Sequence, residues 1–216
     1  MPQITSITLQ KKNKERFNVF VDGEYLFPVS LEVLTEFGLS KGQELSPDKI
    51  DEIVEAENID KIFNKVLNFI SYRMRTRWEI EQRLDKYLYE AALTPVLKEK
   101  FKITILEKVE RVGLINDEDF VKVYVEGQKT VRTPLGLQKI KEFLFKKGVT
   151  QSIIDKYLVS YTTDIERKGA DIVASKKIRK MDLSDYKDKQ KLWKFLAGKG
   201  YTSDVIKAVV DSKFKV

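Results

Sequence analysis

Apolar residues recur along this chain with a helical period, and one such pattern occurs twice in nearly the same form. Residues 139–158 (KIKEFLFKKGVTQSIIDKYL) and residues 191–210 (KLWKFLAGKGYTSDVIKAVV) align after a shift of 52 positions, which carries Gly148 onto Gly200. Each copy has apolar residues at i, i+3 and i+4 on both sides of a Lys-Gly pair, the spacing of amphipathic helices that share a core. The sequence therefore predicts two copies of a helix-turn-helix unit.

The residues of each turn indicate how the helices end and begin. Gly148 and Gly200 are expected to end the first helix of each copy, because glycine adopts the left-handed conformation that follows a C-cap. Thr150 and Thr202 are expected to begin the second helix as N-caps, with the hydroxyl oxygen accepting a hydrogen bond from a free backbone N–H.

A period of two replaces the helical period near the N-terminus. Residues 4–9 (ITSITL) and 16–21 (RFNVFV) alternate apolar and polar side chains, as half-buried strands do. Asp22-Gly23 then precedes the β-prone residues 25–27, and Asp-Gly favours a type I′ hairpin turn because both central residues need a positive φ. We expect a small antiparallel sheet within residues 3–28.

Helix signals fill the rest of the chain. Ser30 and Ser46-Pro47 are typical helix starts, and we expect a break near Glu57-Asn58 in the helix that follows Ser46. A junction at residues 73–76, a loop at 91–95 and a stop at Gly113 divide the next region into helices. The predicted fold is mostly α, with a small N-terminal antiparallel β-hairpin or sheet.

The helices group into tandem three-helix repeats, which bury apolar faces against their neighbours and form an elongated, curved array. The expected domains are an N-terminal extension with short helices (residues 1–57) and three repeats (residues 58–114, 115–162 and 163–216). In the first repeat, Leu84 takes the place that Leu144 and Leu196 hold in the others.

Composition narrows the class of protein. The 216 residues include no cysteine, which excludes disulfides and thiolate metal sites, and no apolar run long enough to span a membrane. The first residues lead directly into patterned sequence with no signal-peptide core. We expect a cytoplasmic protein without membrane association.

The charge of +7 is unevenly distributed. Residues 1–60 carry six Lys or Arg against twelve Asp or Glu, whereas residues 61–216 carry 34 against 21. The excess positive charge of the repeats indicates a polyanion or an acidic protein surface as partner. The alternative is a solvated helical array that happens to be rich in lysine.

No catalytic set is present. The chain has no histidine, and neither a phosphate-binding P-loop nor a dinucleotide-binding GxGxxG motif occurs. Residues 117–119 (DED) form one tight carboxylate cluster, but helix capping by Asn116 explains it better than a Mg²⁺ site does. Trp78 and Trp193 are interpreted as packing residues. We expect a protein that is not an enzyme and needs no metal or cofactor.

Basic residues are the best candidates for a binding surface. The Lys176–Lys180 segment is too dense for helix capping alone, and phosphate contacts or an acidic partner explain it better. The second helices of the repeated unit lack the Arg, Asn and Gln residues that read base edges, so base-specific recognition is not expected. The candidate residues are Arg73, Arg75, Arg77, Arg132, Lys146, Lys147, Lys176, Lys177, Arg179, Lys180, Lys191 and Lys194.

Four stretches, in the same order, resemble motifs of the bacterial RecX family. They are FISYR (69–73) continuing through Arg75 to Leu84, VGLIND (112–117) continuing to Tyr124, residues 136–149 ending in KGV, and KQKLWKFLAGKGYTSDVI (189–206). The hairpin stretch at residues 14–24 is also similar to the N-terminal extension of longer members. The resemblance covers nearly the whole chain.

The resemblance implies a regulator that acts by binding. Proteins of the RecX family bind the RecA filament on single-stranded DNA, lie in its groove and inhibit ATP hydrolysis, filament growth and strand exchange. The implied roles are in homologous recombination, DNA repair and the SOS response. We expect a monomer that binds RecA filaments, with direct contacts to DNA phosphates. A helical repeat protein that binds nucleic acid without RecA and without sequence preference is the alternative.

Overall fold

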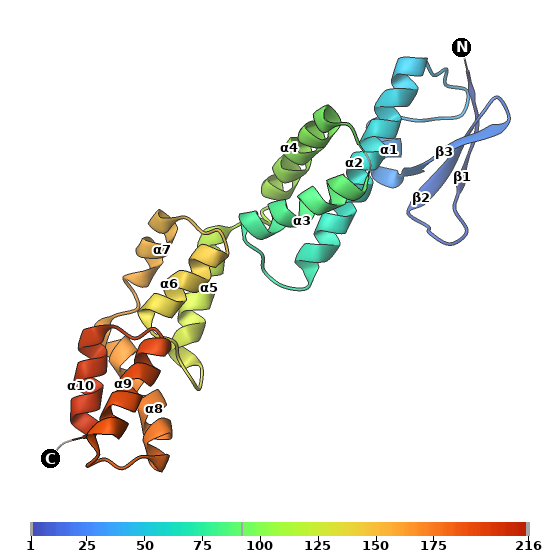
Figure 1. Cartoon of the computed structure of the whole chain (residues 1–216). Coiled ribbons are helices and arrows are strands. Elements are labelled where there is room, and N and C mark those ends of the chain that lie inside the picture. The colour runs from blue at the N-terminus through green and yellow to red at the C-terminus, as the bar shows by residue number, and fades with distance from the viewer. Residues whose placement is uncertain (1, 92, 215–216) are drawn as a thin grey trace. The chain divides into compact units, whose positions relative to one another are not determined.

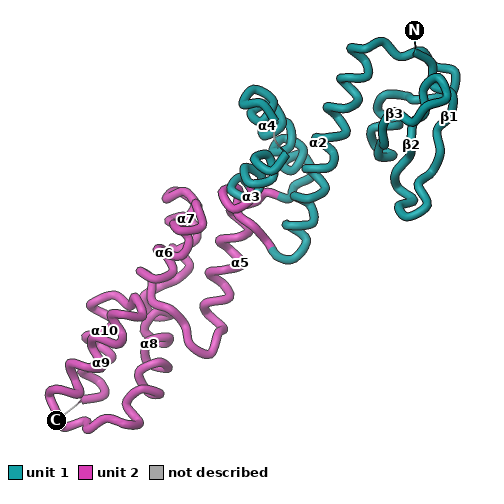
Figure 2. Tube along the Cα trace, turned by 45° about the vertical axis from the view of Figure 1, so that its right-hand side comes forward, with its two compact units in different colours: residues 1–73, 81–114 teal, residues 74–80, 115–216 magenta. Residues whose placement is uncertain are grey.

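The computed structural model describes residues 2–91 and 93–214, which form three β-strands followed by ten α-helices and one short 3-10 helix (Figure 1). The chain divides into two compact units (Figure 2). Unit 1 contains residues 1–73 and 81–114, and unit 2 contains residues 74–80 and 115–216. The boundary falls inside α3 (Arg77–Glu90), whose first four residues belong to unit 2.

The predicted sheet is confirmed. Strands β1 (Ile4–Leu9), β2 (Arg16–Val21) and β3 (Glu24–Ser30) pair antiparallel in the order β1-β2-β3. Asp22 and Gly23 connect β2 to β3 with φ angles of 50° and 89°, as the Asp-Gly signal predicted. The alternation of the strands turns one face of the sheet toward a core shared with the following helices.

This core joins the sheet to α1 (Leu31–Glu36) and to the first half of α2 (Pro47–Ser71). The predicted caps are both formed, since the hydroxyl oxygens of Ser30 and Ser46 accept from the backbone N–H groups of Val33 and Lys49. The buried members of the cluster are Ile4, Val19, Val21, Phe27, Val29, Val33, Leu39, Leu45 and Ile53.

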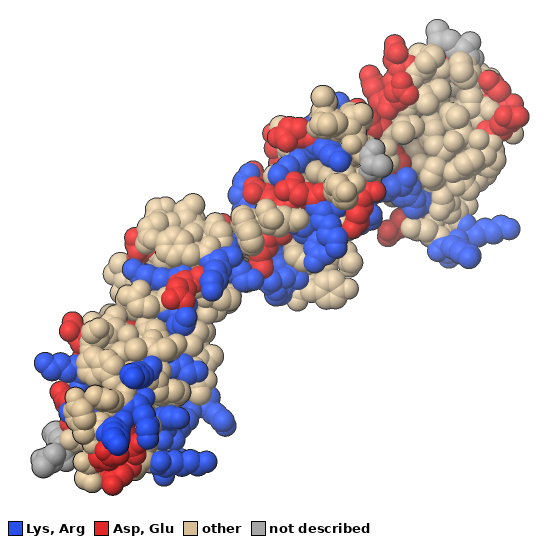
Figure 3. All heavy atoms as spheres, in the orientation of Figure 1, with Lys and Arg blue, Asp and Glu red and all other residues tan. Residues whose placement is uncertain are grey.

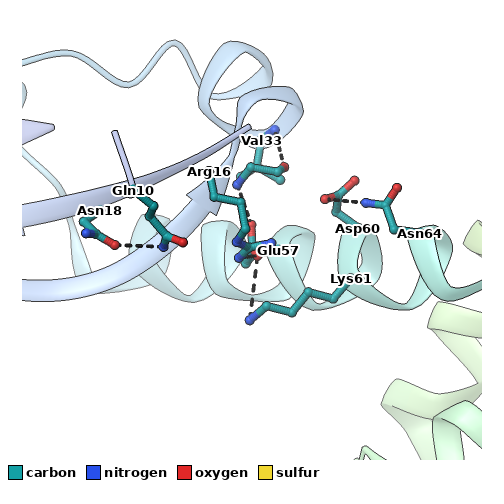
Figure 4. A network of polar contacts seen from close by, with 9 residues as sticks. Gln10, Arg16, Asn18, Val33, Glu57, Asp60, Lys61 and Asn64 are labelled. Atoms are coloured by element: carbon teal, nitrogen blue, oxygen red, sulfur yellow. Dashed lines mark hydrogen bonds and ion pairs between the residues drawn. The ribbon is translucent and has the colours of Figure 1, made fainter. Parts of the chain in front are cut away.

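The expected break near Glu57-Asn58 is wrong, because α2 runs through this position as one helix of 25 residues. The side chain of Glu57 is buried, and its carboxylate accepts from the Arg16 guanidinium and from the backbone N–H of Ser30 at 2.8 Å (Figure 4). Lys61 lies 3.7 Å away on the next turn. Glu57, at the position of the expected break, therefore binds α2 to strands β2 and β3.

The second half of α2 combines with α3 and α4 (Pro95–Arg111) into the first three-helix unit. Thr94 and Pro95 begin α4, and Gly113 follows its end with a φ of 71°. Residue 92 of the expected loop lies outside the described residues. The buried apolar side chains of these three helices include Ile62, Val66, Leu84, Leu88, Phe101, Ile105 and Val109.

Compact unit 2 contains two of the three-helix units. From here on, these are called the second unit and the third unit. The second consists of α5 (Asp117–Thr130), α6 (Leu137–Lys146) and α7 (Gln151–Leu158). The third consists of α8 (Thr163–Lys177), the 3-10 turn η1 (Ile178–Lys180), α9 (Tyr186–Gly198) and α10 (Ser203–Lys213). The two copies predicted from the sequence are α6–α7 and α9–α10.

Equivalent positions of the two copies have equivalent environments. Ile140, Leu144, Ile154 and Leu158 are buried in the core of the second unit, as are Leu192, Leu196, Ile206 and Val210 in the core of the third. Gly148 and Gly200 have φ angles of 74° and 83°, which confirms their predicted role in ending the preceding helix.

The prediction for the two threonine caps is only half right. Thr150 and Thr202 occupy the N-cap positions of α7 and α10, but neither hydroxyl accepts a capping hydrogen bond. The Thr150 hydroxyl lies 3.2 Å from that of Ser152, and the Thr202 hydroxyl donates to Glu166 at 2.9 Å. A carboxylate from another helix thus engages both the hydroxyl and the backbone N–H of the N-cap residue of α10.

Candidate functional site

The second and third three-helix units meet where the start of α6 lies on the turn between α9 and α10. The backbone N–H of Gly136 donates to the carbonyl of Lys199 at 3.0 Å, and that of Gln138 donates to the carbonyl of Gly200 at 2.9 Å. A Cβ on Gly136 would lie 2.1 Å from the backbone nitrogen of Tyr201. The two segments can approach this closely only because position 136 lacks a side chain.

A buried carboxylate joins three helices at this junction. Glu166 of α8 accepts from the backbone N–H groups of Leu137 and Thr202, both at 3.0 Å, and from the Thr202 hydroxyl. It therefore satisfies donors at the N-termini of α6 and α10, where the helix dipoles favour a negative charge. No sequence pattern indicated this role, because the partners lie 29 and 36 residues away.

Two buried tyrosines complete the junction. The hydroxyl of Tyr161 donates to the carbonyl of Leu135 at 2.9 Å, and that of Tyr201 donates to the carbonyl of Pro134 at 2.7 Å. Burial raises the pKa of Tyr161 to about 12 and raises the pKa of Tyr201 as well. Both phenols therefore remain neutral donors at physiological pH and hold the segment that leads into α6.

A related contact joins the start of α3 to the second unit. The hydroxyl of Thr76 donates to the carbonyl of Lys147 at 2.6 Å, and a Cβ on Gly148 would lie 2.3 Å from the Cβ of Trp78. The Lys147 ammonium pairs with the carboxylate of Glu79 at 2.6 Å. Each Lys-Gly turn thus receives the first turn of a helix that lies earlier in the chain.

This contact gives one of the predicted binding residues a structural partner. The Lys147 side chain is about one quarter exposed, and the Glu79 carboxylate that it contacts is mostly buried. Lys146, by contrast, is exposed at the end of α6. Of this predicted pair, Lys146 is the residue that faces solvent.

The other candidates gather on the third unit and on the loop before α6. Lys176 donates from its ammonium to the carbonyl of Arg132 at 2.5 Å, which links the end of α8 to that loop. Arg179 and Lys180 are exposed in η1, and Lys194 is exposed on α9. Lys191 pairs with Asp188 at 2.7 Å. Figure 3 displays many basic side chains over the third unit on the face shown.

A cavity of about 270 Å³ opens among these residues. Its lining is Thr133, Val173, Lys176, Lys177, Phe195 and Lys199. The ammonium groups of Lys177 and Lys199 lie over the Phe195 ring, at 5.1 and 5.9 Å from its centroid. Lys199 was absent from the predicted set, although the repeat alignment pairs it with Lys147.

Three predicted arginines lie near the boundary between the two units. Arg73 belongs to unit 1, whereas Arg75 and Arg77 belong to unit 2. The backbone N–H of Arg77 donates to the Asp117 carboxylate at 2.8 Å. This contact ties the first residue of α3 to the first residue of α5.

The carboxylates of residues 117–119 have separate partners, and the predicted cap by Asn116 is confirmed. Asp117 accepts from the Arg77 backbone, Asp119 accepts from Asn116, and Glu118 accepts from Lys156 and Tyr157. The hydrogen bonds from Lys156 and Tyr157 lower the pKa of Glu118. Within residues 2–91 and 93–214, no group of three or more metal-binding side chains is arranged to hold an ion.

The packing interpretation of the two tryptophans is confirmed only for the base of Trp78. Trp78 packs its base against Gly148 but is 44% exposed, and Trp193 on α9 is 37% exposed and lies outside the buried cluster of the third unit. Leu192 and Leu196 form the buried stripe of α9, so Trp193 faces away from it. The helical period of the apolar residues alone did not distinguish the buried face of α9 from the face that carries Trp193.

The structure is that of a helical-repeat protein, with tandem three-helix units and a small N-terminal sheet. Lysines gather where the second and third units meet. None of the helices in the described part of the chain combines the length and apolar character needed to cross a bilayer. Residues 2–46 match the family described as "Regulatory protein RecX N-terminal domain". Residues 63–93 and 169–210 match the first and the third RecX three-helix domain.

Whole-chain comparisons agree. The chain is 37% identical over 207 residues to Regulatory protein RecX of Listeria innocua, covering 95% of this chain and 73% of the relative. It is 35% identical to Regulatory protein RecX of Bacillus subtilis, covering 98% and 77%. A crystal structure of regulatory protein RecX superposes with a TM-score of 0.79 at 31% identity, covering 98% of this chain and all of that one.

A second solved structure, of RecX from Lactobacillus salivarius, superposes with a TM-score of 0.62 at 26% identity and covers 74% of this chain. The chain belongs to the RecX family of regulatory proteins. The resemblance noted in four sequence motifs is therefore confirmed, as is the mostly helical fold with three-helix repeats and a small sheet.

Proposed function

We propose that this protein regulates RecA by binding the RecA filament on single-stranded DNA. In this proposal it inhibits ATP hydrolysis, filament growth and strand exchange, and so modulates recombination and DNA repair. The observation that carries the proposal is the relationship to Regulatory protein RecX over 95% of the chain. The excess of positive charge in residues 61–216 supports a filament that exposes DNA phosphates as the partner.

The proposed action is binding by a cytoplasmic monomer rather than catalysis. The sequence has no histidine, and the carboxylates of its one tight acidic cluster are engaged in helix capping and ion pairs. We keep residues 1–57, 58–114, 115–162 and 163–216 as the proposed domains, although the first boundary falls within α2. The separate buried clusters of the second and third units support the last boundary.

An ATPase titration tests this proposal. RecA hydrolyses ATP on single-stranded DNA, and adding this protein up to stoichiometric amounts should lower the rate. Changing Lys177, Arg179 and Lys180 together to Gln should weaken the inhibition. The matched control changes Lys11, Lys12 and Lys14 to Gln, because these lysines are also exposed and lie in the β1–β2 turn. An ATPase rate that stays constant throughout the titration would overturn the proposal.

The concentration of positive charge in the repeats also favours a second candidate, a nucleic-acid-binding protein that acts without RecA. This candidate predicts tight binding to bare DNA of any sequence, with a steep loss of affinity as salt is raised. Strong binding to RecA filaments together with weak binding to bare DNA would exclude it.

A further inference from the structure

The repeat alignment draws attention to an aromatic ring of the third unit, Phe195, which is half-buried against the core of that unit. The shift of 52 positions carries Phe143 onto Phe195 and Tyr124 onto Lys176. In the second unit, Tyr124 stacks on Phe143 with a centroid distance of 4.3 Å and an interplanar angle of 15°. Among residues 2–91 and 93–214, no aromatic ring stacks on Phe195 in the same way.

The Phe195 ring lines a cavity whose other walls are positively charged. The cavity of about 270 Å³ has Phe195 and Val173 as apolar lining, and its other lining residues are Thr133, Lys176, Lys177 and Lys199. Two ammonium groups lie over the ring, so a base that stacks there must displace them toward its own phosphate. The site thus combines a flat apolar surface with several cations within one small cavity.

This combination fits one chemical class of ligand, a flat ring that carries an anion. A nucleotide has both parts, since its base can stack on a phenyl ring while its phosphate binds lysine ammonium groups. Of the two forms of a nucleic-acid strand, the unpaired one presents a base in this way, because the bases of a duplex are stacked on one another. An acidic peptide would pair with the lysines but leave the Phe195 ring unused.

The cavity lies at a fixed junction, which gives it a defined shape. Lys176 is bonded to the backbone of Arg132, and Gly136 is bonded to the backbone of Lys199, so both sides of the cavity are held by contacts between the second and third units. The backbone segments that carry the lysines are therefore held in place by these contacts.

We propose that the cavity over Phe195 binds one nucleotide unit of a single strand, with its base on the Phe195 ring and its phosphate between Lys176, Lys177 and Lys199. This inference deepens the proposed function, on which it rests, by naming the position at which the third repeat would contact DNA. The two proposals fail separately, because the test of this one contains no RecA.

The test measures binding of the full chain to fluorescein-labelled oligo(dT) at low salt by fluorescence anisotropy. Phe195→Leu should lower the affinity by about 5- to 150-fold, which corresponds to the stacking of one base. The salt dependence of this variant should stay that of the unchanged protein. Lys177→Gln should instead reduce the slope of log K against log salt by about 0.7. Phe195→Tyr keeps an aromatic ring and should restore binding.

Phe143→Leu is the matched control, because it removes the equivalent ring of the second unit, which Tyr124 already covers. Circular dichroism and thermal unfolding should identify folded variants before binding is compared. Equal affinity of Phe195→Leu and the unchanged protein for oligo(dT) would overturn the proposal. The proposal would also fail if poly-glutamate displaced all of the oligo(dT) and the lysine variants, but not Phe195→Leu, lost binding. The partner would then be an acidic protein.

Discussion

The backbone N–H of Gly136 donates to the carbonyl of Lys199 at 3.0 Å, so the first turn of α6 lies directly on the turn that separates α9 from α10. A shift of 60 positions, which carries Leu84 onto Leu144, carries Thr76 onto Gly136. Thr76 in turn donates to the carbonyl of Lys147. The same kind of junction therefore occurs twice in unit 2, with a hydroxyl donor in one case and a backbone donor in the other.

Gly136→Ala should disrupt the junction of the second and third units. The new Cβ would lie 2.1 to 2.3 Å from backbone atoms of Gly200 and Tyr201, so the backbones must separate. We expect a loss of about 1–3 kcal/mol or more in the free energy of unfolding, measured by urea denaturation.

Gly127→Ala is the control for this change. Gly127 lies within α5, where a Cβ would meet nothing within 4 Å. The substitution should raise stability by about 0.5–1 kcal/mol, because alanine is the better helix former. If Gly136→Ala unfolded at the same urea concentration as the unchanged protein, the close approach described at this junction would be wrong.

Glu166→Ala should destabilise unit 2 by about 2–5 kcal/mol, because the backbone N–H groups of Leu137 and Thr202 would lose a buried charged acceptor. The exposed Glu142 pairs with Lys139 on its own helix, so Glu142→Ala should change stability by about 0.5 kcal/mol or less. Thermal unfolding of both variants makes the comparison. Similar losses would indicate that Glu166 is not the acceptor that joins the helices.

Core and surface residues of the repeats should respond differently to truncation. Ile154→Ala and Ile206→Ala should each cost about 2–5 kcal/mol, because both side chains are buried and would leave cavities. Lys177→Ala and Arg179→Ala should stay within about 0.5 kcal/mol of the unchanged protein and weaken binding instead. Denaturation and filament binding measured on the same samples would separate the two groups, and equal losses of stability would refute the assignment.

Asp60 of α2 should make stability depend on pH. Burial raises the pKa of Asp60 above its ordinary value of 3.8, so the folded state holds this proton more tightly than the unfolded state does. The ionised Asp60 carboxylate therefore destabilises the folded state at neutral pH. This destabilisation disappears as the pH falls through the raised pKa and then through 3.8.

Asp60→Asn removes this charge and keeps an oxygen that can accept from Asn64, as Asp60 does (Figure 4). The variant should be more stable than the unchanged protein at pH 7, and the difference should shrink toward pH 3. Glu57→Gln is the contrasting change. It should lower stability at pH 7, because it removes the buried negative charge that pairs with Arg16. A stability difference for Asp60→Asn that grew as pH fell would contradict this account.

Local signals predicted most of the fold. The alternation in β1 and β2, the Asp-Gly turn, and the Lys-Gly turns at Gly148 and Gly200 depend on residues that are neighbours in sequence. The errors arose where distant residues decide. Near the expected break, Arg16 from 41 positions earlier pairs with the buried Glu57 carboxylate, and the Thr202 hydroxyl donates to Glu166, 36 positions away, instead of capping α10.

The sequence predicted which residue types form the candidate site, but not how these residues are arranged in space. The density of Lys and Arg at residues 176–180 indicated a binding surface from the sequence alone. The cavity over Phe195 depends on Lys199 and Thr133, which only the junction of two repeats brings beside α8. The role of Lys147 could not be foreseen either, because its partner Glu79 lies 68 positions earlier.

Co-sedimentation with RecA filaments on single-stranded DNA, across a salt series, tests the proposed function most directly. The unchanged protein should sediment with the filaments and stay in solution with RecA alone. The variant with Lys177, Arg179 and Lys180 changed to Gln should be released at lower salt than the variant with Lys11, Lys12 and Lys14 changed to Gln. Protein that remains in the supernatant at every salt concentration, with filaments present, would contradict the account.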